Sequence, residues 1–382
     1  MSEQLRPNVL RDAMTVAKQK PQLSIQYLRA VAALMVVAFH AFFEASRFGY
    51  RGHVQDVLTS GVDVFFVISG FIMWYTTFST AMTPMEFFGR RIQRIVPLYW
   101  ALTSVVVAVL LIRPEYVQSM QFQLHHVVSS YLFIPATHPL LPNRMEPVLT
   151  PGWTLNYEMF FYLLFGLCLL VPRRRRHLTV VGVIGLIASL RAFHFPYPSV
   201  PAFYCSSIIL EFAAGVILGY LITCGIVLPL RASVLLLIGG VLGLIAMSVF
   251  VNSWLPRALM WGVPATAIVG GAVFYERAHA VPDLSVPRLL GDASYSIYLS
   301  HPILLSAFSQ LWRKAGFSAL SYAHPLFVVL SVVLAAMGGV TVYRFVELPL
   351  SRAFSRKRSA LAVQAGSEHV ALVVHEGPPL RM

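Results

Sequence analysis

The stretch LRAVAALMVVAFH, from Leu28 to His40, decides the fold class of this chain. Every residue between Arg29 and His40 is apolar, and the predominantly apolar run around them covers about residues 25–43. A run of this length matches the roughly 17–25 residues that a helix needs to cross a bilayer. The stretch therefore predicts a membrane-spanning helix with a cation near one end and an imidazole inside it.

The composition of the whole chain agrees with this interpretation. Of its 382 residues, 57% are hydrophobic and only 12% are charged, whereas soluble domains average about 45–50% apolar and about 25% charged residues. A soluble fold could not hide this much apolar surface in its interior. The composition excludes a single soluble domain, a disordered chain and a disulfide scaffold. It predicts an all-α, polytopic membrane protein.

Ten apolar runs follow one another along the chain. They cover residues 25–43, 61–79, 95–112, 153–171, 178–194, 205–223, 232–251, 257–275, 293–312 and 325–345. We expect them to form a bundle of about ten transmembrane helices in one domain, residues 25–350. A shorter run at 121–136 should be re-entrant or interfacial, because short apolar segments often do not cross. Polar tails are expected at 1–24 and, disordered, at 351–382.

The basic residues predict an orientation. The chain holds 29 Lys and Arg against 16 Asp and Glu. The basic residues form short clusters between apolar runs, at 90–94, 173–176 and 352–358. This distribution is typical of the positive-inside rule, and it favours both termini in the cytoplasm if 121–136 does not cross. We therefore expect no nucleic-acid partner; the excess charge serves topology and contact with membrane lipids.

Arg29 and His40 are the most informative ionisable pair. Eleven residues separate them, which is three helical turns plus about 20°, so both should project from one face about 16 Å apart. Glu44 lies four residues after His40 and should share that face. Two plainer interpretations stay open: Arg29 can extend to the interface from a helix end, and a buried His can be structural.

Other polar residues also fall inside or beside apolar runs. Arg91 and Arg94, three residues apart and next to Arg90, are spaced to clamp phosphates, although orientation alone would explain them. Glu158 lies inside an apolar run, so it needs a partner or water. The remaining candidates for substrate contact or structural polar roles are Asp63, Trp153, Asn156, Tyr298, His301 and Glu347. For Asp63 the alternative is an interfacial position, and for Glu347 an ion pair with Arg344.

Six stretches in this order resemble the membrane acyltransferase-3 family, and within it the branch of exopolysaccharide O-acetyltransferases. They are RAVAALMVVAFH, GVDVFFVISGF, RRIQRIVPLYW, WTLNYEMFFY, SYSIYLSHP and FVELP, and the resemblance spans about residues 22–350. The resemblance implies a bundle in the bacterial cytoplasmic (inner) membrane that takes an acyl group from cytoplasmic acyl-CoA. It also implies a hydroxyl of a polysaccharide or lipid-linked oligosaccharide as the acceptor.

The resemblance also assigns roles to residues. His40 matches the essential histidine, Arg29 the arginine of the first-helix motif, Arg91 and Arg94 the basic loop motif, and Glu158 the acidic residue after the Trp. The chemistry agrees, because a sugar hydroxyl needs a base or an activated acyl donor and the phosphates of CoA need cations. His40 can be the general base or a transient acyl acceptor, with Glu158 or Glu44 setting its tautomer.

Several points stay open at this level. No metal motif appears, and no permanently bound cofactor is expected. Acetyl is the preferred acyl group and succinyl a variant. A second hypothesis is a proton-coupled transporter or flippase of a lipid-linked sugar, in which His40, Glu158 and His301 form a proton path. A structural subunit without turnover would not explain ionisable residues in at least three of the helices.

Overall fold

The structure is a computed structural model in which residues 22–50, 55–78, 80, 82–117, 120–250, 255–317 and 323–353 are described. Across these residues every regular element is a helix, and the one strand-like pairing is an isolated bridge between Thr137 and Met145. The predicted all-helical class is therefore confirmed. Most of the N-terminal tail, and the C-terminal tail from residue 354, lie outside the described residues.

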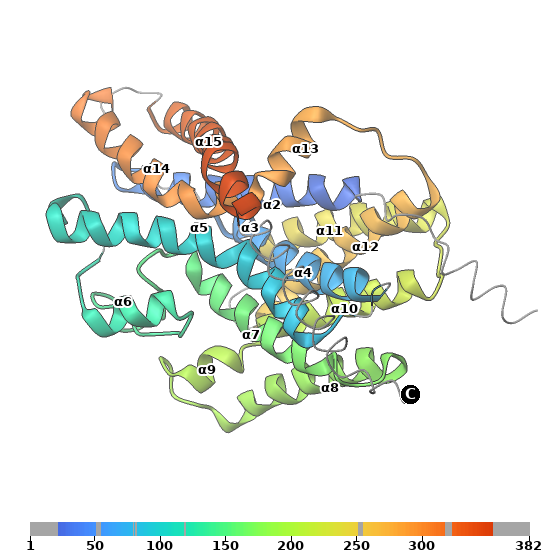
Figure 1. Ribbon diagram of the computed structural model, residues 1–382. Helices are drawn as coiled ribbons and strands as arrows, with labels where there is room; N and C mark the ends of the chain where they lie inside the picture. The colour runs from blue at the N-terminus through green and yellow to red at the C-terminus, as the bar shows by residue number, and fades with distance from the viewer. Residues whose placement is uncertain are drawn as a thin grey trace, which may run out of the picture.

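Each of the ten expected apolar runs overlaps a helix of the bundle (Figure 1). These helices are α2 (Leu23–Ser46), α4 (Gly61–Phe78), α5 (Pro84–Ile112), α7 (Gly152–Cys168), α8 (Arg173–Ser189), α10 (Leu210–Thr223), α11 (Leu230–Phe250), α12 (Val263–Ala278), α14 (Ser294–Lys314) and α15 (Ala323–Val342). The short elements between them are α3 (Gln55–Thr59), η1 (Pro114–Tyr116), α6 (Leu124–Tyr131), η2 (Leu190–Phe193), α9 (Val200–Tyr204), η3 (Ser207–Ile209), η4 (Ala258–Gly262), α13 (Ser285–Asp292) and η6 (Tyr343–Glu347).

Seven helical segments of the described chain are long and apolar enough to cross a membrane. They are Leu23–Ser46, Asp56–Phe78, Pro84–Ile112, Arg173–Phe193, Leu230–Val249, Ala258–Ala278 and His324–Ala353. The other three expected spans differ from these in length or composition: α7 has 17 residues, α10 belongs to a shorter apolar helix, and α14 carries buried serines and His301. A multi-pass membrane protein follows; ten crossings and the orientation of the termini stay predictions.

The helices approach one another most closely where glycines remove the side chain. A methyl group added at Gly70 on α4 would lie 2.1 Å from the carbonyl oxygen of Phe212 on α10, and one added at Gly215 would lie 2.0 Å from that of Val67. Small residues allow this backbone contact between helices in a membrane. The crossing of α4 and α10 holds one wall of the polar cavity described below.

Helix α2 lies against α4, α12, α13, α14 and α15, so its neighbours surround much of it (Figure 1). Its first turn is closed by a side chain from a distant part of the sequence. The Glu276 carboxylate, at the end of α12, accepts hydrogen bonds from the backbone N–H of Leu23 at 2.8 Å and of Ser24 at 3.0 Å. A carboxylate at a helix N-terminus satisfies free N–H groups and complements the helix dipole.

The segment 121–136 contains α6, a helix of eight residues. At about 1.5 Å per residue, α6 is roughly 12 Å long, whereas the hydrocarbon core is about 30 Å thick. It packs on α5, where the Tyr99 hydroxyl donates to the Ser130 carbonyl at 3.1 Å and the Trp100 indole donates to the Tyr131 carbonyl at 2.9 Å. A helix of this length does not cross a bilayer by itself.

Candidate active site

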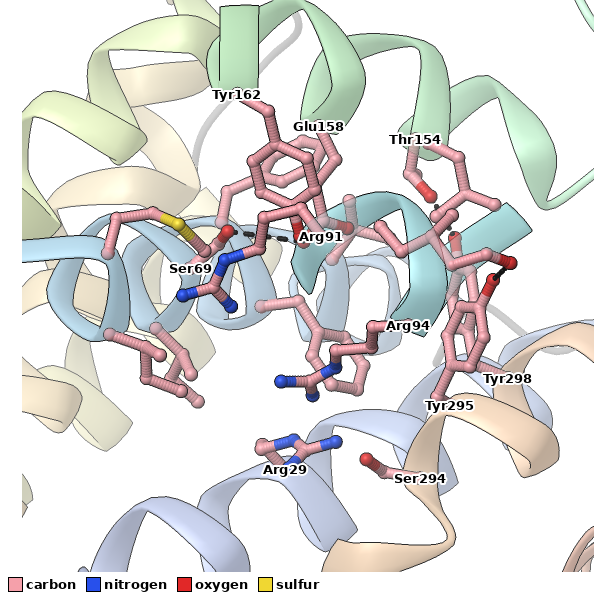
Figure 2. A pocket seen from close by; sticks show the side chains of 18 residues that line it. Arg29, Ser69, Arg91, Arg94, Thr154, Glu158, Tyr162, Ser294, Tyr295 and Tyr298 are labelled. Atoms are coloured by element: carbon pink, nitrogen blue, oxygen red, sulfur yellow. Dashed lines mark hydrogen bonds between the residues drawn. The ribbon is translucent and has the colours of Figure 1, made fainter. Parts of the chain in front are cut away.

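A cavity of about 80 Å³ lies where α2, α4, α5, α7 and α14 meet (Figure 2). Its apolar lining comes mainly from α4, including Val62, Phe65 and Phe66. Its polar lining consists of Arg29, Ser69, Arg91, Arg94, Thr154, Glu158, Tyr162, Ser294, Tyr295 and Tyr298. The first helix, the basic segment and the segment after Trp153, which lie far apart in the sequence, are therefore brought together.

Three guanidinium groups face this cavity without an ion-pair partner among the described residues (Figure 2). Arg29 is only 8% exposed, and it donates to the Gln26 side chain at 3.0 Å. Arg91 donates to Thr76 Oγ1 at 3.2 Å. A buried cation without a counter-ion is costly, so the arrangement is suited to an anion that enters from outside.

Among the residues that the structure describes, Glu158 is the one carboxylate that lines the cavity. Its Oε1 accepts hydrogen bonds from Tyr162 and, at 3.2 Å, from Ser69 Oγ. The carboxylate is therefore held by hydroxyl groups rather than neutralised by one of the arginines. With three guanidinium groups and one carboxylate, the cavity has an excess of positive charge.

A second cavity, of about 280 Å³, adjoins the first. Arg94, whose side chain is exposed, lines both, and the second is also lined by Arg90, Gln93 and Glu347. Arg90, Arg91 and Arg94, all in the first half of α5, thus contribute basic side chains to the linings of the two cavities. An elongated anion could contact Arg90 and Arg94 at one end and Arg29 at the other.

His40 lies farther along α2, outside the linings of both cavities. Its ring centroid is 4.7 Å from that of His301 on α14, while Arg29 shares its cavity with Ser294 and Tyr295 from the same helix. Both α2 side chains therefore face α14. Tyr298 stands between the two places, because it lines the cavity and its ring lies 6.0 Å from that of His301.

In a second charged cluster, an arginine and a carboxylate pair with each other. Asp63, fully buried on α4, accepts two hydrogen bonds from Arg257, at 2.9 Å from Nε and 2.7 Å from Nη2. Glu211 on α10 lies beside this pair and is 1% exposed, and neither of its carboxylate oxygens has a hydrogen-bond partner among the described residues. Asp63 is thus neutralised by Arg257 inside the protein, and the alternative of an interfacial position, near the start of α4, stays open.

Comparison with known proteins gives the family. Residues 22–344 match a family described as an acyltransferase domain. The chain belongs to this family. It is 38% identical to the exopolysaccharide production protein ExoZ of Rhizobium meliloti over 317 residues, which cover 82% of this chain and 96% of that protein.

Two further members of the family are more distant. The chain is 24% identical to the peptidoglycan O-acetyltransferase OatA of Listeria monocytogenes, over 86% of this chain and 56% of that protein. It is also 24% identical to the acyltransferase MdmB of Streptomyces mycarofaciens, over 88% of this chain and 93% of that protein. No solved structure matches the chain. The resemblance seen in the six sequence stretches is confirmed, and the chain is an acyltransferase.

His40 forms no hydrogen bond with Glu44 or Glu158, the two acidic residues predicted to set its tautomer. Nδ1 of His40 bonds to the Val36 carbonyl at 2.9 Å, and Glu44 instead faces Arg47 at 3.5 Å. Glu158 is engaged by Ser69 and Tyr162. The prediction that Glu44 or Glu158 fixes the tautomer is therefore wrong: a backbone carbonyl one turn earlier does so, which side-chain spacing alone does not reveal.

Three other predicted residues, Glu347, Trp153 and Asn156, have different surroundings. Glu347 accepts a hydrogen bond from Ser296 Oγ at 2.6 Å and forms no ion pair with the exposed Arg344, because the π-helical turn η6 alters the spacing of side chains. Trp153 packs edge-on against Tyr157, with ring centroids 6.0 Å apart. Asn156 is buried, and its Oδ1 has no partner among the described residues. Trp153 and Asn156 do not line either cavity.

Sequence analysis missed Arg257, Glu211 and Glu276. Arg257 stands at the start of the apolar run 257–275, and the spacing of charges in a sequence does not show which distant carboxylate such a residue contacts. Glu211 could have been found, since it interrupts the apolar stretch IILEFAAGV as Glu158 interrupts its own. Among the described residues, no three His, Cys, Asp or Glu side chains gather as metal ligands would.

Proposed function

We propose that this acyltransferase moves an acyl group, acetyl by preference, from cytoplasmic acyl-CoA to a hydroxyl of an exopolysaccharide or of its lipid-linked precursor. In this proposal the protein lies in the bacterial cytoplasmic membrane, with the beginnings of α2 and α5 at the cytoplasmic face. The acceptor class follows the names of the relatives, which refer to exopolysaccharide production and to O-acetylation of peptidoglycan.

The observation that carries the proposal is the set of unpaired guanidinium groups around the first cavity. Phosphate oxygens form strong charge-assisted hydrogen bonds with Arg, and acyl-CoA carries several phosphates at one end of a long, flexible pantetheine arm. Arg90 and Arg94 would hold the nucleotide end in the second cavity, and Arg29 and Arg91 would hold anionic groups deeper inside. The thioester at the other end of the arm would then extend past Tyr298 toward His40.

The proposed chemistry needs one base. Since a carbonyl oxygen only accepts hydrogen bonds, Nδ1 of His40 carries the proton in its bond to Val36, and Nε2 keeps a free lone pair. Nε2 takes the proton of the sugar hydroxyl while the hydroxyl oxygen attacks the thioester carbonyl. The C–S bond breaks, and the thiolate of CoA takes the proton back from Nε2. The products are the ester and free CoA.

The test is acyl transfer by the purified protein from labelled acetyl-CoA to the polysaccharide of its own host. His40→Ala should lower the rate by about 10²–10⁴-fold, the usual contribution of a general base, while the protein still inserts and stays monodisperse. His125→Ala is the matched control, because His125 is exposed on α6 away from both cavities. Unchanged transfer by the His40 variant would contradict the mechanism.

A further inference from the structure

Two histidines, His40 and His301, lie in contact with each other, and the reaction described above uses only His40. His40 comes from α2 and His301 from α14, and their ring centroids are 4.7 Å apart, with the ring planes inclined at 55°. Phe39 packs edge-on against His40 from the same helix. Two helices that are far apart in the sequence thus bring two imidazoles into contact inside the membrane domain.

The hydrogen bonds of the pair determine where its protons lie. Nδ1 of His301 bonds to the Tyr298 carbonyl at 2.6 Å, just as Nδ1 of His40 bonds to the Val36 carbonyl. Because a carbonyl cannot donate, both Nδ1 atoms carry a proton, and in each neutral ring Nε2 is left as an acceptor. Two acceptors in contacting rings cannot bond to each other until one of them gains a proton.

Burial makes the unbonded acceptor of His301, its Nε2 atom, costly in free energy. His301 is 0% exposed, and its Nε2 has no hydrogen-bond partner among the described residues. A buried polar atom without a partner costs free energy and calls for an explanation. His40, in contrast, is partly exposed. Of the two side chains, His40 alone retains exposed surface, so the proposal assigns the contact with the substrate to His40.

We propose that His301 is a positioning residue that stabilises the protonated form of His40 during acyl transfer. The inference rests on the proposed function. When Nε2 of His40 has taken the proton of the sugar hydroxyl, it becomes an N–H donor, and its hydrogen is shared in a bifurcated bond between the substrate oxygen and Nε2 of His301. When the CoA thiolate removes that proton, the bond is lost and the pair returns to two acceptors. His301 gains and loses no proton in the cycle.

Two substitutions separate this role from a structural one. The amide N–H of Asn in His301→Asn takes the place of Nδ1–H and keeps the bond to Tyr298, but the acceptor at Nε2 is lost. The longer Gln in His301→Gln carries a carbonyl oxygen to the place of Nε2 and loses the bond to Tyr298. A structural role favours Asn, whereas the proposal favours Gln.

The measurement is kcat and KM for acetyl-CoA of both variants after size-exclusion chromatography. We expect kcat of the Asn variant to fall about 10- to 100-fold, the contribution of one hydrogen bond to a charged group, kcat of the Gln variant to fall less, and KM to stay the same in both. Ser309→Ala is the control, because Ser309 is also buried on α14 and its hydroxyl has no hydrogen-bond partner in the described part of the chain. An Asn variant as active as the Gln variant, or more active, would overturn the proposal.

A second measurement needs no variant. Nitrogen NMR of the wild-type protein labelled at histidine should show both rings with the proton on Nδ1, and a neutral ring with its proton on Nε2 at either position would overturn the proposal. The inference and the proposed function can also fail separately. Full activity of His40→Ala would end both, whereas loss of activity in His40→Ala with full activity in His301→Asn would end only the role of His301.

Discussion

Two clusters of arginine and carboxylate lie in this membrane domain, and they are built in opposite ways. In one, Arg257 donates two hydrogen bonds to Asp63, of 2.9 and 2.7 Å. In the other, Arg29 and Arg91 line the same cavity as Glu158 without forming an ion pair with it, and the carboxylate accepts hydrogen bonds from hydroxyl groups instead (Figure 2). The same residue types thus form a neutralised ion pair in one place, whereas in the other they leave arginines without a counter-ion.

The difference teaches how to separate structural charge from charge kept for a ligand. A buried ion pair is expensive to break, because removing one partner leaves the other charge uncompensated. A buried cation without a partner already carries its desolvation cost, and only a binding anion offsets it. Substitutions in the two clusters should therefore change different quantities.

The largest effect is expected at the cluster of Asp63, Glu211 and Arg257. Arg257→Ala leaves Asp63 and Glu211, at 0% and 1% exposure, without a counter-ion, and we expect a loss of about 3–5 kcal/mol in stability. Thermal unfolding of the protein in detergent measures it. Arg191→Ala, at an exposed position, is the control and should unfold like the wild type. An Arg257 variant as stable as the wild type would break the comparison.

A smaller effect, on binding rather than folding, is expected at the cluster of Arg29, Arg91 and Glu158. Arg29→Met keeps the length of the side chain and removes a buried cation whose one hydrogen bond among the described residues is to Gln26. The affinity for acetyl-CoA should fall about 10- to 100-fold, the worth of one hydrogen bond to a charged group. The unfolding temperature should stay the same or rise. A loss of stability like that of Arg257→Ala would mean that Arg29 is structural.

The smallest effect is expected at Glu276, whose carboxylate caps the first turn of α2 and forms no part of either cluster. Glu276→Gln keeps an acceptor at the first turn of α2 but removes the charge that complements the helix dipole. We expect a loss of about 1 kcal/mol in stability and unchanged affinity for acetyl-CoA. Glu115→Gln, in an exposed ion pair with Arg113, is the control. A large loss of donor affinity in the Glu276 variant would link this cap to the cavity.

Much of the fold follows from the sequence, because the length and hydropathy of a run are local properties. Each of the ten apolar runs became a helix, and the close approach at Gly70 follows from the absence of a side chain. The cap from Glu276 could not be foreseen, since it joins residues more than 250 positions apart.

The site divides in the same way. Helical periodicity correctly placed Arg29 and His40 toward one neighbour. Arg91 and Arg94, whose spacing suited a joint phosphate contact, line one cavity. Which acid would accompany which base depends on how helices pack, so Glu44 was wrongly given to His40 and Arg257 was missed. The Val36 carbonyl that bonds to His40 belongs to the backbone and has no sequence signature.

The most direct test of the central claim, that the unpaired arginines hold the anionic donor, is competition for labelled acetyl-CoA on the purified wild-type protein. Free CoA and adenosine 3′,5′-bisphosphate should displace the label, and adenosine, which has no phosphate, should not. The affinity should also fall as salt is raised, because charge-assisted contacts at an open mouth are screened. Displacement by adenosine as effective as by the bisphosphate, or no binding of acetyl-CoA at all, would contradict the account.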